Sequence, residues 1–241
     1  MHTAAILIVG DEILSGEIRD ENAPFLLALF AEAGIAVERV VVAPDERSAI
    51  VAEVRRLRAL ADAVVVSGGI GPTHDDVTRM AVAEALGLEL ESHPAAAERI
   101  HAWHGAGTTE AESAMALLPA GAVLVDGERT GVFGFAVGGV FALPGVPFLF
   151  RDIARTLPAH FETAPLYHEE IRVEEREGEI ASLLAAAQDR APDVAMGSYP
   201  ACEDGVWCVR VILRGPDAAR LGRVAADLRA LLAARGEEWW S

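Results

Sequence analysis

The stretch Ser67-Gly68-Gly69-Ile70-Gly71-Pro72-Thr73-His74-Asp75-Asp76 follows a short apolar run, Ala63–Val66, and precedes residues of helical period. Its three glycines permit unusual backbone angles and let a ligand approach the main chain closely. A helix that begins near Thr73 would direct its free N–H groups and the positive end of its dipole towards an anion. The stretch therefore predicts a turn between a strand and a helix, with a candidate phosphate site in the turn.

The same residues also have a purely structural interpretation. Thr73-x-x-Asp76 resembles a capping box with aspartate in place of glutamate, and acidic residues stabilise a helix start. Ligand binding is favoured because three glycines exceed what a helix cap requires. Asp45 has a comparable alternative, since it stands where the N-cap of the helix that carries Ile50 and Val54 would be. From the residues alone, both interpretations stay open for Asp45 and for Asp76.

Two more apolar runs, Ala4–Val9 and Val37–Val42, lie before this stretch. All three runs are nearly continuous, as in strands of a parallel sheet that are covered on both faces. Residues of helical spacing separate them, namely Leu26, Leu29, Phe30 and Ala33, and then Ile50, Val54, Leu57 and Ala61. The order predicts an α/β fold, a three-layer α/β/α sandwich with a mostly parallel, doubly wound sheet.

The second half of the chain predicts a hairpin and a separate small domain. Gly138-Gly139 suits the tight turn between the strands Phe135–Val137 and Val140–Leu143. We expect a main domain over residues 1–162 and a small α+β domain, of order β-α-β-β-α, over residues 163–241. Its strands are expected at His168–Val173, Val194–Tyr199 and Val206–Leu213. Gly105–Ser113, which is polar and contains glycine, is predicted to be a mobile loop.

The composition restricts the possible partners. The net charge is −17, and all 20 basic residues are arginines. The lack of lysine excludes Schiff-base chemistry and the lysine of a Walker loop, so bound phosphate requires backbone N–H groups, arginines or a metal ion. An acidic chain is repelled by nucleic acids and anionic membranes, so neither is an expected partner. With two cysteines, no bilayer-length apolar run and no recognisable signal peptide, a cytoplasmic location is expected.

Four segments should converge at one edge of the sheet, because open α/β sheets bind ligands beyond the carboxyl ends of their strands. They are Gly10-Asp11-Glu12, Pro44-Asp45-Glu46, Gly68–Asp76 and Leu143–Pro147. Adjacent carboxylates such as Asp11 and Glu12 at the end of a buried strand are costly unless they are paired or bound to a metal. The sequence thus predicts a crevice lined by glycines and carboxylates.

Several of these motifs resemble one known family. Gly10-Asp11-Glu12-Ile13-Leu14-x-Gly16, Asp20-x-Asn22, Asp45 and Gly68-Gly69-Ile70-Gly71-Pro72-Thr73-x-Asp75-Asp76-x-Thr78 resemble the competence/damage-inducible protein A (CinA) family. The N-terminal domain of that family has the molybdopterin-binding fold shared with the MoaB and MogA proteins. Leu143-Pro144-Gly145-Val146-Pro147 fits as well. The C-terminal part is similar to the family's KH-like appendage but lacks a Gly-x-x-Gly loop, so RNA binding is not expected.

The resemblance implies a small phosphorylated ligand, a pterin or a nucleotide. Some members hydrolyse ADP-ribose or a related pyrophosphate with a divalent metal ion. Asp45 and Asp76 match aspartates implicated in catalysis, and Asp11, Glu12 and Asp75 are the expected metal ligands. The expected ligand-binding residues are Gly10, Asn22, Gly68, Gly69, Gly71, Thr73, Pro144 and Gly145. Full-length CinA proteins continue into an amidohydrolase domain that acts on nicotinamide mononucleotide, an activity not expected of this chain.

Two departures from the family pattern concern one wall of the expected site. The loop Arg129–Gly134 lacks the asparagine and proline of the family segment, and Leu149 replaces a usual glutamate. Metal-dependent hydrolysis of a nucleotide pyrophosphate such as ADP-ribose is the favoured function. The alternatives are non-catalytic binding of molybdopterin or another phosphorylated pterin or nucleotide, and a structural protein with a vestigial site. The resemblance, together with Trp239-Trp240, also predicts a homo-oligomer.

Overall fold

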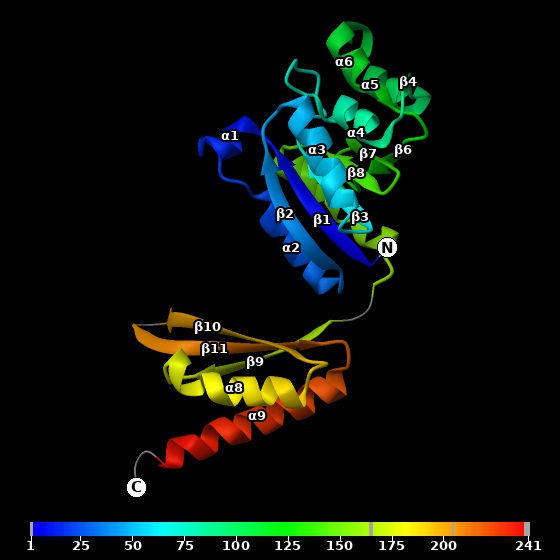
Figure 1. Ribbon diagram of the computed structural model, residues 1–241. Coiled ribbons are helices and arrows are strands. Elements are labelled where there is room, and N and C mark those ends of the chain that lie inside the picture. Colours follow the sequence, from blue (N-terminus) through cyan, green and yellow to red (C-terminus); the bar gives the residue numbers. More distant parts are fainter. Residues whose placement is uncertain (1, 164–165, 204, 239–241) are drawn as a thin grey trace. The chain divides into compact units, whose positions relative to one another are not determined.

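The computed structural model describes residues 2–163, 166–203 and 205–238. The chain divides into two compact units, Met1–Thr163 and Ala164–Ser241 (Figure 1). This division falls one residue after the boundary expected at residue 162. Trp239-Trp240, on which the expectation of an oligomer partly rests, lie outside the described residues.

The N-terminal unit is built on a six-stranded sheet with the strand order β2-β1-β3-β8-β7-β6. Its strands are β1 (Thr3–Val9), β2 (Ala36–Ala43), β3 (Ala63–Ser67), β6 (Val123–Asp126), β7 (Phe133–Val137) and β8 (Val140–Leu143). β1 pairs in parallel with β2 and β3, and β3 pairs in parallel with β8. β7 is antiparallel to β6 and β8, with the predicted Gly138-Gly139 turn joining β7 to β8. The predicted mostly parallel sheet is confirmed.

Helices cover both faces of this sheet, which confirms the three-layer arrangement (Figure 1). One face packs against α2 (Asn22–Glu32) and α7 (Pro147–Ala154), and the other against α3 (Arg47–Arg58), α4 (Thr78–Leu86) and α5 (Pro94–His104). Alternate residues of β1, such as Ile6 and Leu7, enter the two cores and are fully buried. Burying each such side chain stabilises the fold by about 2 kcal/mol.

β2 departs from the expectation that all three apolar runs are covered on both faces. It is the edge strand of the sheet, and Val40 and Val42 are 39% and 37% exposed. The run at Val37–Val42 predicted the strand correctly, but the signal for its position was overlooked. Glu38 and Arg39 interrupt the run, and charged side chains of this kind are typical of an edge strand.

Two expected segments differ from the structure. α4 begins at Thr78 and not near Thr73, and Gly105–Ser113 is not a loop throughout. It contains the 3-10 helix η1 (Gly105–Gly107) and most of α6 (Glu110–Ala114), whose N-cap Thr109 forms a capping box with Glu112. The Thr109 hydroxyl accepts the N–H of Glu112 at 3.2 Å, and the Glu112 carboxylate accepts the N–H of Thr109 at 2.8 Å. This pattern is visible in the sequence and outweighs the glycines before it.

The remaining elements are short or belong to the C-terminal unit. The N-terminal unit also contains α1 (Asp11–Leu14), η2 (Leu157–His160) and a two-stranded sheet of β4 (Leu90–Ser92) and β5 (Leu117–Pro119). The C-terminal unit contains β9 (Tyr167–Val173), α8 (Glu177–Arg190), β10 (Ala195–Glu203), β11 (Val206–Gly215) and α9 (Ala218–Glu238). Its antiparallel sheet has the order β10-β11-β9, and the predicted β-α-β-β-α order is confirmed. Within the described part of the chain, none of the helices has the length and apolar character needed to cross a membrane.

Candidate functional site

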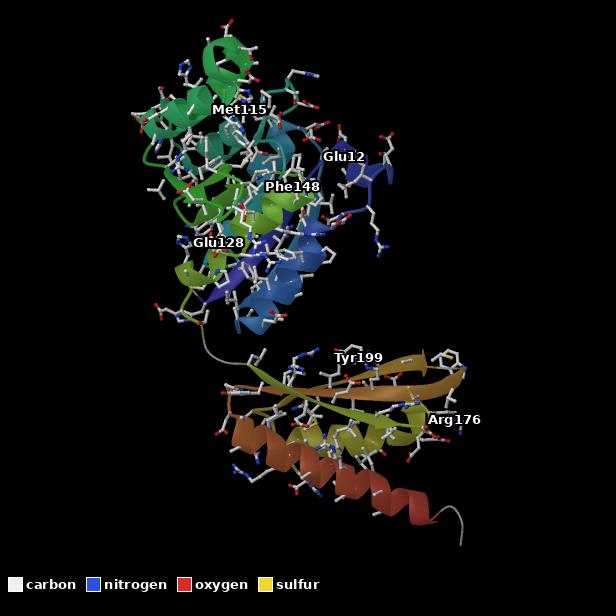
Figure 2. The ribbon with its side chains drawn as sticks, turned by 180° about the vertical axis from the view of Figure 1, so that it is seen from behind. Glu12, Met115, Glu128, Phe148, Arg176 and Tyr199 are labelled. Atoms are coloured by element: carbon white, nitrogen blue, oxygen red, sulfur yellow. The ribbon has the colours of Figure 1, made fainter. Side chains whose placement is uncertain are left out.

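A cleft of about 610 Å³ opens beyond the carboxyl ends of the parallel strands. This volume is in the range of small-molecule binding sites. Of the sequence-predicted residues, Glu12, Asn22, Asp45, Gly68, Gly69, Gly71, Thr73, Asp75, Asp76, Pro144 and Gly145 line it. Figure 2 shows two lining residues, Glu12 on α1 and Met115 after α6, at the same end of the N-terminal unit. The predicted convergence of glycines and carboxylates on one crevice therefore exists.

The glycine-rich turn is fixed to the sheet at Gly68. Its φ angle is 108°, and a Cβ atom there would lie 2.3 Å from the carbonyl oxygen of Val9, so only glycine fits. The N–H of Gly68 donates to the carbonyl of Leu143 at 3.0 Å, while its own carbonyl accepts the Thr78 hydroxyl at 2.8 Å. The turn is thus bonded to β8 and to the first residue of α4.

The next three residues of the turn line the cleft and have backbone N–H groups without a partner in the described part of the chain. Within the described residues, no hydrogen bond uses the N–H groups of Gly69, Ile70 or Gly71. All three residues line the cleft. Successive unpaired N–H groups of this kind are suited to oxygen atoms of a phosphate. The candidate phosphate site therefore consists of Gly69–Gly71, at the start of the predicted stretch.

Asp76 does not cap α4. Its carboxylate accepts the N–H of Thr73 at 2.8 Å and also accepts the Thr73 hydroxyl, so it closes a turn before the helix. Gly71 is close to the same carboxylate, since a Cβ atom at Gly71 would lie 2.7 Å from Asp76 Oδ2. The structural interpretation of Thr73-x-x-Asp76 predicted correctly that these two residues are hydrogen-bonded to each other. Their bonds stabilise a turn before α4, however, and not the start of the helix.

Arg79 supports the glycine-rich turn from within the protein and was not predicted. It is only 8% exposed, and its guanidinium donates to the carbonyls of Gly71 at 3.1 Å and Ala114 at 2.9 Å. Burial lowers the pKa of Arg79, while the nearby Asp76 carboxylate raises it. The sequence signal that could have identified Arg79 is its charge, because it lies in the otherwise apolar stripe of α4.

Asp45 lies at the end of β2 and is bonded to the end of β1. Its carboxylate accepts the N–H of Asp11 at 2.8 Å, and the Asp11 carboxylate accepts the N–H of Asp45 at 3.4 Å. Partial burial raises the pKa of Asp45 above its ordinary value. The N–H of Asp11 opposes this shift, and the negative charges of Glu12, Asp11 and Asp75 add to it. A carboxylate with a raised pKa in a cleft is a candidate proton acceptor.

Asn22 joins three segments of the site. It is 5% exposed, and its Nδ2 donates to the Ser67 hydroxyl at 2.9 Å and to the Gly145 carbonyl at 2.7 Å. Because a carbonyl can only accept, the second bond fixes which way the amide faces. Its Oδ1 is buried and has no partner among the described residues. Asn22 therefore positions β3 and the Pro144-Gly145 turn, and it retains one acceptor for a ligand donor.

The altered Arg129–Gly134 loop is held by Asp152, a residue that the sequence did not reveal. The buried Asp152 carboxylate accepts the N–H groups of Arg129 and Thr130 and the Thr130 hydroxyl, at 2.7–3.2 Å. These bonds lower the pKa of Asp152, and the bond from the Thr130 hydroxyl has the largest effect. Val132 and Phe133 from this loop line the cleft, as does Leu149. The fourth wall is therefore apolar.

Two predicted residues do not line the cleft. The N–H of Gly10 donates to the carbonyl of Ala43 at 3.1 Å, and Asp11 contacts Asp45 as described. Among the described residues, no three His, Cys, Asp or Glu side chains are placed so that they could hold a metal ion. Asp11, Glu12 and Asp75 thus do not form a preassembled three-ligand site. Magnesium is commonly bound by one or two carboxylates together with substrate phosphates, an arrangement that fits the Asp76 carboxylate in the cleft.

Comparisons with known proteins identify the family of the N-terminal unit. Residues 5–160 match the family described as the probable molybdopterin binding domain. The chain belongs to this family. Residues 165–237, in the C-terminal unit, match the family described as the middle domain of FAD synthase. The molybdopterin-binding domain therefore contains the whole cleft, since all the residues that line it lie between Ile8 and Leu149.

Individual relatives of this molybdopterin-binding domain protein include CinA. A protein from Archaeoglobus fulgidus is 32% identical, covering 81% of this chain and 84% of that protein. A CinA-like protein from Geobacter sp. (strain M21) is 33% identical to this chain. The matched region covers 95% of this chain but only 58% of the Geobacter protein. A similar solved structure is the crystal structure of the protein CinA, of unknown function, from Thermoplasma acidophilum. Its sequence is 31% identical, the TM-score is 0.62, and the matched region covers 66% of this chain and 97% of that one. The predicted relationship to CinA is confirmed.

Proposed function

We propose that this protein hydrolyses the phosphoanhydride bond of a nucleotide pyrophosphate, such as ADP-ribose, in the cleft of its molybdopterin-binding domain. The observation that carries the proposal is the presence in one cleft of two features. They are the N–H groups of Gly69–Gly71, which have no partner among the described residues, and the Asp45 carboxylate with its raised pKa. The first feature suits phosphate oxygens, and the second suits the removal of a proton from water.

Each residue has a role in this reaction. The N–H groups of Gly69–Gly71 bind the oxygens of one phosphoryl group and stabilise the charge that develops on it. Asp45 accepts a proton from water as the water oxygen attacks phosphorus. The bridging P–O bond breaks, and ADP-ribose yields AMP and ribose 5-phosphate. Arg19, an exposed cation that also lines the cleft, offsets the negative charge of the substrate.

A divalent metal ion remains part of the proposal, held by the Asp76 carboxylate together with the substrate, which leaves Asp45 free to accept the proton. When bound, it would neutralise the pyrophosphate and polarise the P–O bonds. Without lysine near the site, the protein's own positive groups there are few, which increases the need for such a charge.

The test is an assay of the purified protein with ADP-ribose, FAD and other dinucleotides, with and without Mg²⁺ or Mn²⁺. Release of a mononucleotide is the expected result. An inactive protein that binds these ligands would instead support the second candidate, binding of a phosphorylated pterin or nucleotide without turnover. That candidate is favoured by Leu149, which lines the cleft where a glutamate is usual in CinA proteins. Assembly into a homo-oligomer stays a prediction, which light scattering can test.

A further inference from the structure

One wall of the cleft is apolar and contains an exposed tryptophan. This wall consists of Ile70, Trp103, Met115, Val132 and Phe133. The same five residues line an adjoining cavity of about 70 Å³, which extends towards the buried side chains of Ile100, Leu118 and Phe135. None of the five wall residues carries a charge, so the wall contrasts with the acidic residues elsewhere in the cleft.

Trp103 is placed on this wall by α5. Ala96 and Ile100 are buried and pack the helix against the core. Trp103 lies seven residues after Ala96 and three after Ile100, so it belongs to the same stripe on one face of the helix. The stripe predicts a buried side chain, yet Trp103 is 59% exposed. α5 ends one residue later, at His104, so the last member of its stripe reaches the cleft instead of the core.

The segment around Trp103 is held in place by specific contacts. His104 Nδ1 lies 3.1 Å from Glu112 Oε1, which links the end of α5 to α6. The capping box of Thr109 and Glu112 orders α6, and Arg79 binds the carbonyl of Ala114 just before Met115. The tryptophan and the methionine thus face the cleft from the two sides of Gly105–Ser113, which these contacts order although the sequence predicted a mobile loop there.

We propose that Trp103 stacks on a bicyclic nitrogen heteroaromatic ring, a purine or a pterin, of the ligand whose phosphate binds at Gly69–Gly71. This inference rests on the proposed function only for the position of the phosphate. An indole offers a large flat surface at little entropic cost, and stacking of a base on an aromatic side chain is favourable for any base. The sulfur of Met115 adds a polarisable contact at the ring edge. The uncharged wall suits a neutral ring.

The test compares two ligands that differ only by the ring, AMP and ribose 5-phosphate. Dissociation constants are measured by calorimetry for the full chain, for Trp103→Ala and for Trp103→Phe. Trp207→Ala is the matched control, because Trp207 is 72% exposed and lies in the C-terminal unit. Neopterin monophosphate, which carries a phosphate as AMP does, distinguishes a pterin from a purine in a parallel titration, and melting temperatures report on folding. Hydrolysis of ADP-ribose is assayed separately on all four proteins.

The wild type is expected to bind AMP or neopterin monophosphate more tightly than ribose 5-phosphate. Trp103→Ala should weaken binding of the preferred ring ligand by about tenfold or more, leaving ribose 5-phosphate affinity and melting temperature unchanged. Trp103→Phe should retain part of the preference, and Trp207→Ala should retain all of it. Equal effects on both ligands, or no preference in the wild type, would overturn the proposal. Ring-selective binding without hydrolysis would refute the proposed hydrolase activity and support the stacking site. Hydrolysis of ADP-ribose that is unaffected by Trp103→Ala would support the hydrolase activity and refute the stacking site.

Discussion

Asp11 and Asp45 bind each other's backbone, with the Asp45 carboxylate 2.8 Å from the N–H of Asp11 and the Asp11 carboxylate 3.4 Å from the N–H of Asp45. This reciprocal pair joins the carboxyl ends of β1 and β2. It places two acidic side chains side by side, which is unfavourable when both are ionised. The hydrogen bonds stabilise the pair, while burial and the neighbouring charges raise the pKa of Asp45.

Asp45→Asn should abolish hydrolysis without destabilising the fold. An amide cannot accept a proton from water, so the rate should fall by about 10²-fold or more. The amide oxygen of the variant side chain would still accept the N–H of Asp11. Glu46→Gln, at an adjacent exposed residue that does not line the cleft, is the control and should retain full activity. A rate within a factor of about two of the wild type in Asp45→Asn would show that Asp45 only supports the turn.

The pH dependence of Asp45 gives a second, independent measurement. Because its pKa is raised on folding, the stability that its proton contributes is present below pH 3.8 and is lost as the pH rises through the folded pKa. At pH 7 the Asp45→Asn variant should therefore melt at the same temperature as the wild type or higher. The acid limb of the wild-type rate profile should lie above pH 3.8. A limb at or below that value would exclude Asp45 as the base.

Asp76→Asn tests catalysis against closure of the Thr73–Asp76 turn. If Asp76 acts on the substrate or holds a metal, the variant should lose about 10²-fold or more in rate and bind Mg²⁺ more weakly, since an amide is a poorer ligand for a hard cation. Thr73→Val removes the hydroxyl from the same turn but leaves the carboxylate. We expect Thr73→Val to keep most of the activity. Equal losses in the two variants would assign Asp76 to the turn alone.

Asp152→Asn should loosen the wall formed by Val132 and Phe133. The amide nitrogen cannot accept hydrogen bonds, so part of the set from Arg129 and Thr130 is lost, and KM should rise more than kcat falls. Because the pKa of Asp152 is lowered on folding, its contribution to stability is present above pH 3.8 and is lost as the pH falls through the folded pKa. The variant should therefore melt several degrees lower at pH 7 and converge with the wild type in acid. A difference in melting temperature that persists at low pH would contradict this.

Arg19→Ala should weaken ligand binding without affecting the fold. Arg19 is exposed and lines the cleft, so its loss should raise the dissociation constant for pyrophosphate by about tenfold. Arg39→Ala, on the exposed edge strand β2 and away from the cleft, controls for the general change in charge. Calorimetric titrations at two salt concentrations suffice. Identical affinities in the two variants would remove Arg19 from the site.

The net charge of −17 predicts no measurable affinity for RNA or DNA at moderate salt. The sequence of the C-terminal unit supports the same expectation, since its acidic residues outnumber its arginines. The measurement is chromatography on immobilised nucleic acid at about physiological ionic strength. Retention of the intact chain there would contradict the prediction.

Local patterns predicted the sheet and the glycine-rich turn, whereas contacts between distant segments were not visible in the sequence. Gly68 and Asp45 could be placed because each follows a strand that ends in a run of apolar residues. The start of α4 was misplaced by five residues because the Thr73–Asp76 pair closes a turn of its own. Asp152 meets Thr130 across 22 positions, and no periodicity encodes that contact. Trp103 fits a core stripe and is exposed only because α5 ends where it does.

The guanidinium of Arg79 also bears on how fast a ligand can bind. By holding Gly71 and Ala114 together, it connects the phosphate-binding side of the cleft to the segment that carries Met115. Widening the cleft between these two would leave a buried cation without its hydrogen bonds, which is strongly unfavourable. The cleft should therefore keep its width, and association should be a single step whose rate rises linearly with ligand concentration, with no plateau set by a slow opening of the protein.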